Sequence, residues 1–386
     1  MKKKKVILIT NIISPYRIPL FNYITKNGNF NFNVIVLAEK EQNREWQLAK
    51  EKIKFDYKVL PGWHLFFRTK RRDIPIHLNS GVLKTLFHNK PDIVITSGYD
   101  SLAYWVAFFY CKIFKKKYIL WDETTLLSAG GIKGLRGLLK KIIIIGTNKY
   151  IASGTKAKEY LEYFGAKPGN IYISLDTVDV GYFYDKAIRF RSSPGFLLCR
   201  NKYPKLLLLY VGQLIKRKGV GQVLKTLDIL KDPEIGFMIV GSGPEEKKLK
   251  EFCKENKLQN IFFEGFHQQE ELPKYYALAD VFILPSFEEV WGLVVNEALA
   301  SGLYVLCSKY TGVAYDLIND KNGRLFDPKD IDSLIRLIKQ TRQQIVKIKK
   351  RRDSIGEQAH NKFSIKKSAK VFIDTIEELD SKQMKV

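Results

Sequence analysis

The chain has 386 residues, of which 45% are hydrophobic, and a formal net charge of +25 at pH 7. This length predicts two domains that each have a core of their own, and the absence of any internal repeat excludes a solenoid. The first 200 residues hold 34 lysines and arginines against 15 acidic residues, and the remainder holds 31 against 25, so the first half is expected to meet a polyanionic partner, either nucleic acid or an anionic membrane surface.

An apolar run near the N-terminus predicts the first strand of a parallel sheet. Val6 to Thr10 would form this strand, and a helix is expected to begin after Pro19. The loop between such a strand and helix lies at the edge of a doubly wound sheet where ligands bind. Its polar residues are therefore candidates for contacting a ligand: Ser14, Tyr16 and Arg17. For the arginine, the alternative is an ordinary solvated cation on a helix surface.

Three segments of the first half combine cations with aromatic or aliphatic residues. They lie at Trp63 to Arg72, Lys112 to Lys117 and Gly131 to Ile144, among strands expected at Phe32 to Leu37, Phe55 to Leu60 and Ile93 to Ser97. A single charged run is usually a solvated face. Three together favour a surface that lies on an anionic membrane, where each cation contributes about 1 kcal/mol. The longest apolar segment, Leu102 to Phe114, is too short to span a bilayer.

The strand expected from Tyr118 ends in two acidic residues, Asp122 and Glu123, at the edge of the sheet. The alternative interpretation is that they form a helix N-cap and a first-turn acid. An irregular polar linker from Asp185 to Lys205 is then expected to close the first domain. The four cysteines are far apart and lack the spacing of a metal site, as expected of buried thiols in a reducing cytoplasm.

The second domain is expected to begin with the strand Leu206 to Val211. The loop after this strand contains a glycine, a glutamine and three cations: Gly212, Gln213, Lys216, Arg217 and Lys218. A later strand from Phe237 ends in a turn at Gly243, where a glycine lets the backbone approach a ligand closely. A third strand from Ile261 leads to Phe266 and His267.

The most informative stretch runs from Asp280 to Gly302. It predicts a buried strand, a tight loop and a helix that stops at Gly302. Backbone amides at the start of this helix, around Trp291 to Val294, would point at a ligand and favour an anion. Two carboxylates, Glu289 and Glu297, flank these amides, and a carboxylate can accept hydrogen bonds from both hydroxyls of a diol. The alternative is that the first caps the helix and the second lies on its solvated face.

This stretch closely resembles the Glu-x7-Glu signature of family 4 glycosyltransferases, which are retaining enzymes with the two-domain fold called GT-B. The resemblance implies that Glu289 contacts the sugar of a donor and that Glu297 holds the ribose of its nucleotide. It also implies that the amides of Gly292, Leu293 and Val294 contact the diphosphate, and Trp291 is expected to bind the donor beside them.

The resemblance extends to other loops, with two departures. Lys218 matches the family lysine that contacts the donor diphosphate, but Gln213 stands where the family has an arginine. Arg217 or Lys216 would compensate, or the glutamine would hydrogen-bond the phosphate itself. Phe266 and His267 are implied to lie near the nucleobase, the alternative being a solvent-exposed histidine. Family members place a histidine where this chain has Asp122 and Glu123, and we expect Glu123 to orient the acceptor hydroxyl.

The predicted fold is therefore α/β, with two Rossmann-like doubly wound domains that face a cleft. Residues 1–190 would bind the acceptor, residues 191–364 the nucleotide sugar, and residues 365–386 would form a helix that returns to the first domain. The expected catalytic residues are Glu289, Lys218 and Glu123, and we expect neither a metal nor a cofactor.

The predicted activity is retaining transfer of a hexosyl group from a UDP- or GDP-linked sugar to a glycan acceptor, itself polyprenyl-linked, in surface polysaccharide synthesis. The protein would act on the inner face of the plasma membrane, with no nucleic acid partner. The alternatives are a sugar-nucleotide epimerase of the same fold, and a non-catalytic basic module that binds membranes or nucleic acid.

Overall fold

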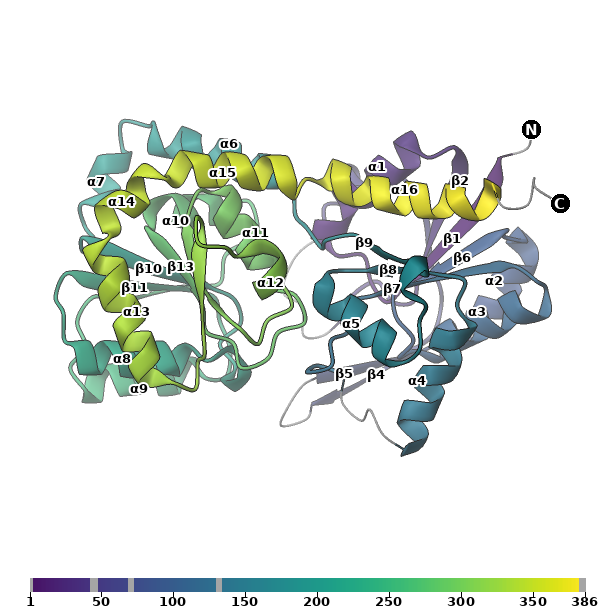
Figure 1. Ribbon diagram of the computed structural model, residues 1–386, viewed down its shortest axis with the longest axis horizontal. Coiled ribbons are helices and arrows are strands. Elements are labelled where there is room, and N and C mark those ends of the chain that lie inside the picture. The colour runs from purple at the N-terminus through teal and green to yellow at the C-terminus, as the bar shows by residue number, and fades with distance from the viewer. Residues whose placement is uncertain (1–2, 42–47, 69–72, 130–133, 382–386) are drawn as a thin grey trace. The chain divides into compact units, whose positions relative to one another are not determined.

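The computed structural model describes residues 3–41, 48–68, 73–129 and 134–381, and it divides into two compact units (Figure 1). Unit 1 consists of Met1–Asp176 and Ile365–Val386, and unit 2 of Thr177–Ser364. Each unit contains one large parallel sheet with helices packed on it, which confirms the expected α/β class.

The sheet of unit 1 has seven parallel strands in the order β3-β2-β1-β6-β7-β8-β9. Their bounds are β1 Lys4–Thr10, β2 Phe30–Val36, β3 Asp56–Val59, β6 Ile93–Thr96, β7 Lys117–Asp122, β8 Lys149–Ala152 and β9 Ile171–Ile173. The central strands are nearly continuous apolar runs because helices cover both faces. From β1 the sheet continues to β2 on one side and from β6 to β7 on the other, so the β1–β6 pair is a topological switch point.

Two apolar clusters occupy the two faces of this sheet. Side chains of α1 Ile18–Asn27 and α16 Ile365–Ser381 pack on one face, around Phe21 and Phe372. Side chains of α2 Gly81–Asn89, α3 Leu102–Ile113, α4 Gly134–Gly146 and α5 Thr155–Tyr163 pack on the other. Single turns complete the unit: η1 Pro15–Arg17, η2 Lys50–Lys52 and η3 Pro168–Asn170.

A separate antiparallel hairpin, β4 Trp63–Arg68 with β5 Asp73–Leu78, follows β3. From the sequence, exposed aromatics and cations were expected here, but no strands. The aromatics are exposed, with Trp63 at 81% and Phe67 at 50%. The segment's other cations, Lys70, Arg71 and Arg72, lie outside the described residues.

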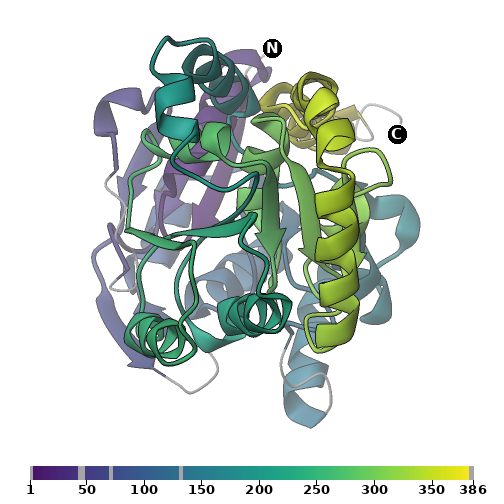
Figure 2. The ribbon, with the colours of Figure 1, turned by 90° about the vertical axis from the view of Figure 1, so that its left-hand side faces the viewer.

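The sheet of unit 2 has six parallel strands in the order β12-β11-β10-β13-β14-β15, and the green arrows near the centre of Figure 2 belong to it. Their bounds are β10 Leu206–Val211, β11 Ile235–Val240, β12 Ile261–Gly265, β13 Val281–Leu284, β14 Tyr304–Ser308 and β15 Gly323–Phe326. The α-helices are α6 Val180–Arg191, α7 Phe196–Arg200, α8 Val220–Leu230, α9 Glu246–Glu255, α10 Leu272–Leu278, α11 Leu293–Ala300, α12 Ala314–Leu317, α13 Ile331–Gln343, α14 Ile345–Lys350 and α15 Arg352–Lys362, with one 3-10 turn, η4 Lys216–Lys218. Here the switch point is the β10–β13 pair.

The unit boundaries differ from the expected ones. Residues 177–190 belong to unit 2 because α6 packs on α10, where the rings of Phe183 and Tyr276 lie 5.9 Å apart. Asp179 caps this helix by accepting a hydrogen bond from the Tyr182 amide at 3.0 Å. The linker expected to be irregular is therefore largely helical, in α6 and α7; its serines, proline and glycine occupy only the short gap between them.

The last helix, α16, belongs to unit 1 and lies beside α1 in Figure 1. Phe372 packs edge-on against Trp121 at 5.0 Å, and the Lys149 ammonium lies 3.0 Å from the Glu378 carboxylate. Residues 382–386 lie outside the described part of the chain.

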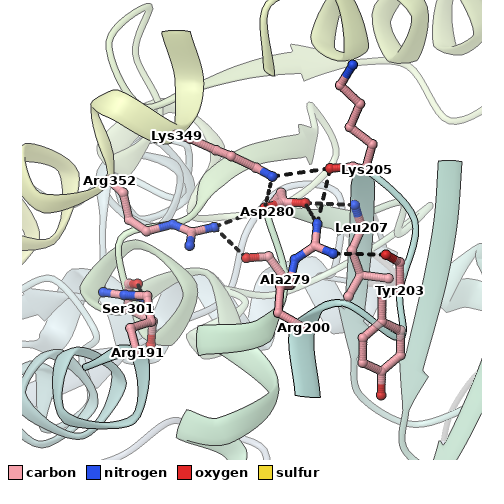
Figure 3. Close-up of polar contacts among 10 residues, drawn as sticks. All are labelled: Arg191, Arg200, Tyr203, Lys205, Leu207, Ala279, Asp280, Ser301, Lys349 and Arg352. Carbon is pink, nitrogen blue, oxygen red and sulfur yellow. Dashed lines mark hydrogen bonds and ion pairs between the residues drawn. The ribbon is translucent and has the colours of Figure 1, made fainter. Parts of the chain in front are cut away.

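A buried carboxylate ties the peripheral helices of unit 2 to the amino end of its sheet (Figure 3). Asp280 precedes β13, and its Oδ2 accepts hydrogen bonds from Arg200 of α7 at 2.6 Å and from the Leu207 amide at 3.0 Å. Its Oδ1 lies 3.1 Å from the Lys349 ammonium and 3.3 Å from Arg352. Since ligands bind at the carboxyl ends of strands in such sheets, this cluster is structural.

Candidate functional site

Two loops meet at the switch point of unit 2, one after β10 and one after β13. The Phe287 amide donates to the Arg217 carbonyl at 2.8 Å. Gly219 has a φ of +71°, and a Cβ placed on it would lie 2.0 Å from the Pro285 carbonyl oxygen. Only glycine allows the two backbones to come this close, so the loops form one rigid edge at the position where ligands of open α/β sheets bind.

This edge brings together the charged residues expected to act on a donor. The Lys218 ammonium pairs with Oε2 of Glu289, and Arg217 Nη1 lies 3.8 Å from the same oxygen. Arg217 also donates to the Glu288 carbonyl at 3.0 Å. The Lys218 and Glu289 side chains are only 14% and 13% exposed, so their charges are weakly screened by water. Arg217 therefore lies beside Lys218, whereas Lys216 is exposed to solvent.

The helix α11 begins at this edge. Gly292 is its N-cap, with a φ of +111°, and the half-exposed Leu293 and Val294 form the first turn. Amides in the first turn of a helix have no acceptor within the helix and can bind an anion. The Trp291 side chain is 3% exposed and donates to Asn296 Oδ1 at 3.1 Å, so this tryptophan anchors the loop from inside.

Glu297 lies one helical turn further along α11 and is completely buried. Its Oε2 accepts a hydrogen bond from the Tyr276 hydroxyl at 2.6 Å, and Tyr276 of α10 is also completely buried. The alternative that Glu297 lies on a solvated face is therefore wrong. Tyr276 was not predicted from the sequence, because nothing in an apolar helical segment shows which tyrosine will contact a carboxylate of the neighbouring helix.

The glycine-rich turn after β11 packs directly on the loop after β10. The Leu214 amide donates to the Ser242 carbonyl at 2.8 Å, and a Cβ on Gly243 would lie 2.5 Å from the Leu214 carbonyl oxygen. Gly212, at the start of the loop after β10, has a φ of +149°, a conformation that favours glycine. The Gln213 side chain is exposed, while its carbonyl accepts a hydrogen bond from the Tyr210 hydroxyl at 2.8 Å.

The loop after β12 carries the two residues expected near a nucleobase. Phe266 is 44% exposed. His267 is held on both ring nitrogens, with Nε2 2.6 Å from the Tyr275 hydroxyl and Nδ1 3.1 Å from Glu271. A freely solvated histidine is therefore not what the structure contains. Of the two residues, the phenylalanine is therefore exposed and the histidine ring is held in place by its neighbours.

In unit 1, the loops after β1 and β6 are joined at the switch point. The Tyr104 hydroxyl donates to Asn11 Oδ1 at 2.8 Å, and Ser97 Oγ donates to Thr10 Oγ1 at 2.9 Å. Ser14 caps the turn η1 by accepting from the Tyr16 amide at 3.3 Å. These contacts fix the loop that leads to Arg17.

Arg17 and Glu123 form an ion pair, and the Arg17 guanidinium stacks 4.0 Å above the Trp121 ring. Arg17 is thus not an ordinary solvated cation. The segment 123–129 is irregular, so the alternative that these acids start a helix is wrong for the described residues. The structure brings together Arg17 of η1 and Glu123 of the loop after β7, both predicted site residues.

Two other carboxyls of unit 1, those of Asp122 and Asp176, have raised pKa values. Asp122 is 2% exposed, and burial raises its pKa to about 7, although its Oδ1 accepts hydrogen bonds from the Thr124 amide at 3.1 Å and hydroxyl at 2.7 Å. Burial also raises the pKa of Asp176, with the Glu123 charge adding to the shift and Arg17 opposing it. Asp176 was not predicted as a site residue from the sequence; it lies three residues after the end of β9.

The basic segments of unit 1 expose apolar side chains beside their cations. On α4, Leu135 is 72% exposed and Leu138 55%, next to exposed Arg136 and Lys141. On α3, Ile113 is 71% exposed. Lys133, from the same basic segment, lies outside the described residues.

The described part of the chain contains neither a candidate metal site nor a candidate membrane-spanning helix. No group of three or more histidine, cysteine or acidic side chains there could hold a metal ion. Within the same residues, no helix combines the length and apolar character needed to cross a membrane.

Parts of the chain are similar in sequence to known proteins. Residues 200–362 match the family model described as glycosyl transferases group 1. The chain is 30% identical over 158 residues to an uncharacterized glycosyltransferase of Methanocaldococcus jannaschii, a match covering 40% of this chain and 39% of that protein. It is 30% identical over 140 residues to the O-antigen chain mannosyltransferase B of Escherichia coli, covering 35% and 36%. Matches to three curated relatives span 39%, 29% and 58% of their own lengths.

Two solved structures resemble the whole chain. The crystal structure of Anabaena Alr3699/HepE in complex with UDP and glucose has a TM-score of 0.71 at 15% identity, covering 97% of this chain and 99% of that one. The structure of WaaG, a glycosyltransferase involved in lipopolysaccharide biosynthesis, has a TM-score of 0.63 at 16% identity, covering 96% and 98%. At such identities the likeness establishes the fold, which is that of the GT-B glycosyltransferases.

Proposed function

We propose that this chain, whose residues 200–362 match the group 1 glycosyl transferases, is a retaining glycosyltransferase of family 4. It would move a hexosyl group from a nucleoside diphosphate sugar to a hydroxyl of a glycan acceptor. The observation that carries the proposal is the meeting of Lys218, Arg217 and Glu289 at the β10–β13 switch point, beside the first turn of α11. Unit 2 would bind the donor and unit 1 the acceptor.

The diphosphate would bind between the cations and the helix. Lys218, Arg217 and the amides of Leu293 and Val294 supply positive charge and donors within one edge of the sheet. When the bond between the anomeric carbon and the diphosphate breaks, its electron pair leaves on the diphosphate oxygen. A pre-arranged set of donors stabilises this developing charge, and such donors commonly contribute the largest part of catalysis.

The two glutamates would hold the parts of the donor on either side of the diphosphate. Glu289 would accept hydrogen bonds from the sugar hydroxyls, and Glu297, fixed by Tyr276, would accept from the ribose diol. The acceptor oxygen bonds to the anomeric carbon, and its proton leaves with the diphosphate. No step requires a metal or cofactor. The donor is UDP- or GDP-linked, and the binding of UDP and glucose by the Anabaena neighbour supports the first.

On the acceptor side, Arg17 and Glu123 would contact the glycan together with Ser14 and Tyr16, which lie in the loop that leads to Arg17. The similarity to an O-antigen chain mannosyltransferase supports surface polysaccharide synthesis, in which the acceptor would be polyprenyl-linked. The exposed leucines and cations of α4 support peripheral binding to the inner face of the plasma membrane.

A thermal-shift panel of UDP, GDP, ADP, CMP and dTDP sugars tests the donor assignment. We expect one nucleotide to raise the melting temperature of the wild type and to fail on Glu297→Gln, which keeps the side-chain shape but removes the charge. If no nucleotide raises the melting temperature of the folded protein, and it still binds anionic liposomes, the non-catalytic module replaces this proposal. Conversion of the donor sugar without any acceptor would favour the epimerase.

A further inference from the structure

We propose that Glu289 makes the site select a diphosphate that carries a sugar over one that ends in a free phosphate. The inference rests on the proposed function and concerns the same site. It assigns to Glu289 a role in rejecting the nucleoside diphosphate product, in addition to contacting the donor sugar.

The carboxylate lies on the cations that would bind the diphosphate. Glu289 Oε2 pairs with the Lys218 ammonium and lies 3.8 Å from Arg217 Nη1. Both partners of the first pair are largely withdrawn from water, so a charge brought to Lys218 interacts strongly with Glu289.

Backbone hydrogen bonds and close packing hold the loop that carries Glu289 in place. The Glu289 amide donates to the Tyr310 carbonyl at 3.3 Å, and its carbonyl accepts from the Gly312 amide at 3.1 Å. A Cβ on Gly312 would lie 1.9 Å from the Val290 carbonyl oxygen, so only glycine fits against this loop. On the other side, the loop of Lys218 is fixed by Gly219 against Pro285. A ligand at Lys218 must therefore accommodate Glu289 and cannot displace it by moving the loop.

Donor and product differ at the group that would meet Glu289. The terminal phosphate of a nucleoside diphosphate carries about −1.5 to −2 at pH 7. In a sugar nucleotide the same phosphorus is esterified and carries a single negative charge, and the sugar brings hydroxyl donors. Glu289 thus repels the terminal phosphate of the product but accepts hydrogen bonds from the sugar of the donor.

Calorimetric titration of Glu289→Gln with a nucleoside diphosphate and its sugar conjugate tests the inference, with the base chosen from UDP and GDP by wild-type binding. We expect the variant to bind the nucleoside diphosphate at least about fivefold more tightly than the wild type. Its affinity for the sugar nucleotide should be unchanged or lower. Glu289→Asp, which keeps the charge, should stay within about twofold of the wild type for the nucleoside diphosphate.

Two controls localise the effect. Glu288→Gln removes the neighbouring carboxylate and should leave the affinity for the nucleoside diphosphate unchanged. In a Lys218→Met background, both affinities should fall but the gain from Glu289→Gln should persist, because the carboxylate repels the terminal phosphate directly. Melting curves of all variants establish that they are folded.

The outcomes separate the two proposals. If the wild type binds both ligands and Glu289→Gln binds the nucleoside diphosphate no more tightly, the inference is overturned and the proposed function stands. If neither wild type nor variant binds any nucleoside diphosphate or its sugar conjugate, both fall.

Discussion

Tyr276 and Glu297 form a contact between two completely buried side chains, at 2.6 Å. Removing the hydroxyl takes a charge-assisted donor away from the carboxylate that would hold the ribose. We expect Tyr276→Phe to weaken nucleotide binding by about tenfold, since such hydrogen bonds contribute about 1.5–3 kcal/mol. The measurement is the dissociation constant of the nucleotide for variant and wild type.

The control is a nucleotide that lacks the ribose diol. Tyr276→Phe should bind a 2′,3′-dideoxy nucleotide as the wild type does, because Glu297 then has no partner on the ligand. Equal losses for both nucleotides would show that Tyr276 supports only the local packing of α10 and α11.

Asp122 gives unit 1 a distinct dependence on pH. Its pKa is about 7 in the folded chain and 3.8 as a free side chain, because burial disfavours the charged form. Between these values the folded state holds a proton that the unfolded state has lost, so stability falls as pH rises through this window and levels above about 7. We expect wild-type stability, relative to Asp122→Asn, to decline by about 2 kcal/mol or more between about pH 5 and about pH 8.

Denaturant unfolding of both proteins across that range measures the effect. Groups shared by the two proteins cancel in the difference. Parallel stability curves would mean that Asp122 titrates normally in the folded chain.

At the residue scale, the candidate site residues that could be predicted from the sequence are those that lie within one strand-loop-helix segment. Glu289, Lys218 and the first turn of α11 were found in this way. Tyr276 and Asp176 were not, because their neighbours depend on how elements far apart in the sequence pack together. The Arg17–Glu123 pair joins loops 106 residues apart, so each residue was named without its contact to the other.

At the scale of elements, the Asp280 cluster holds α7, α14 and α15 on the sheet of unit 2. The Asp280 side chain is 1% exposed, and Arg200 and Arg352 are 13% and 15% exposed. Burial lowers the pKa of the nearby Arg191 to about 10, with the charge of Arg352 adding to the shift. Without Asp280, Arg200 and Arg352 would lose their counter-charge.

We expect Asp280→Asn to destabilise the protein by about 3–5 kcal/mol, the usual cost of leaving buried charges unpaired. Denaturant unfolding checks this value. Asp320→Asn is the matched control: that side chain is 93% exposed and pairs with Arg324 at 2.7 Å. Its loss should cost less than about 1 kcal/mol. Similar costs for the two variants would contradict the account.

The central strands of both sheets were predictable because buried parallel strands are apolar throughout. The hairpin of β4 and β5 was missed, because its cations and aromatics were interpreted as a surface and no turn signal separates its strands. The helices α6 and α7 were missed because Ser192, Ser193, Pro194 and Gly195 dominate the local composition, although Phe183 and Ala187 have helical spacing.

At the scale of the whole molecule, the uneven charge predicts where the protein would meet a membrane. Leu135 and Leu138 of α4 are exposed and flank the cation Arg136. We expect replacement of both leucines by glutamine to reduce retention on anionic liposomes by at least about tenfold. Each leucine that becomes partly buried in the membrane interface would contribute about 1 kcal/mol to binding. Sedimentation with vesicles containing phosphatidylglycerol measures retention.

Leu198→Gln in α7 is the control, because this leucine is 73% exposed but belongs to unit 2. If the α4 substitutions leave retention unchanged, or if the control loses retention equally, α4 is not the element that binds the membrane. Raised salt should weaken wild-type binding, since part of the attraction is between exposed charges.

The α/β class and two-domain organisation followed from length and from alternating strands and helices. The position of the unit boundary did not, because it depends on which neighbours α6 contacts. Composition also could not show whether the polyanionic partner is a membrane or a nucleic acid. The exposed leucines beside the cations of α4 favour a membrane.

Donor turnover by Glu289→Ala tests the central claim most directly. The rate to measure is the release of nucleoside diphosphate from the sugar nucleotide that the wild type binds. We expect the wild type to release it and Glu289→Ala to do so at least about tenfold more slowly, equivalent to about 1.4 kcal/mol of barrier. Turnover near the wild-type rate in this variant would contradict the role of Glu289, and no turnover by the wild type would contradict the assignment as a glycosyltransferase.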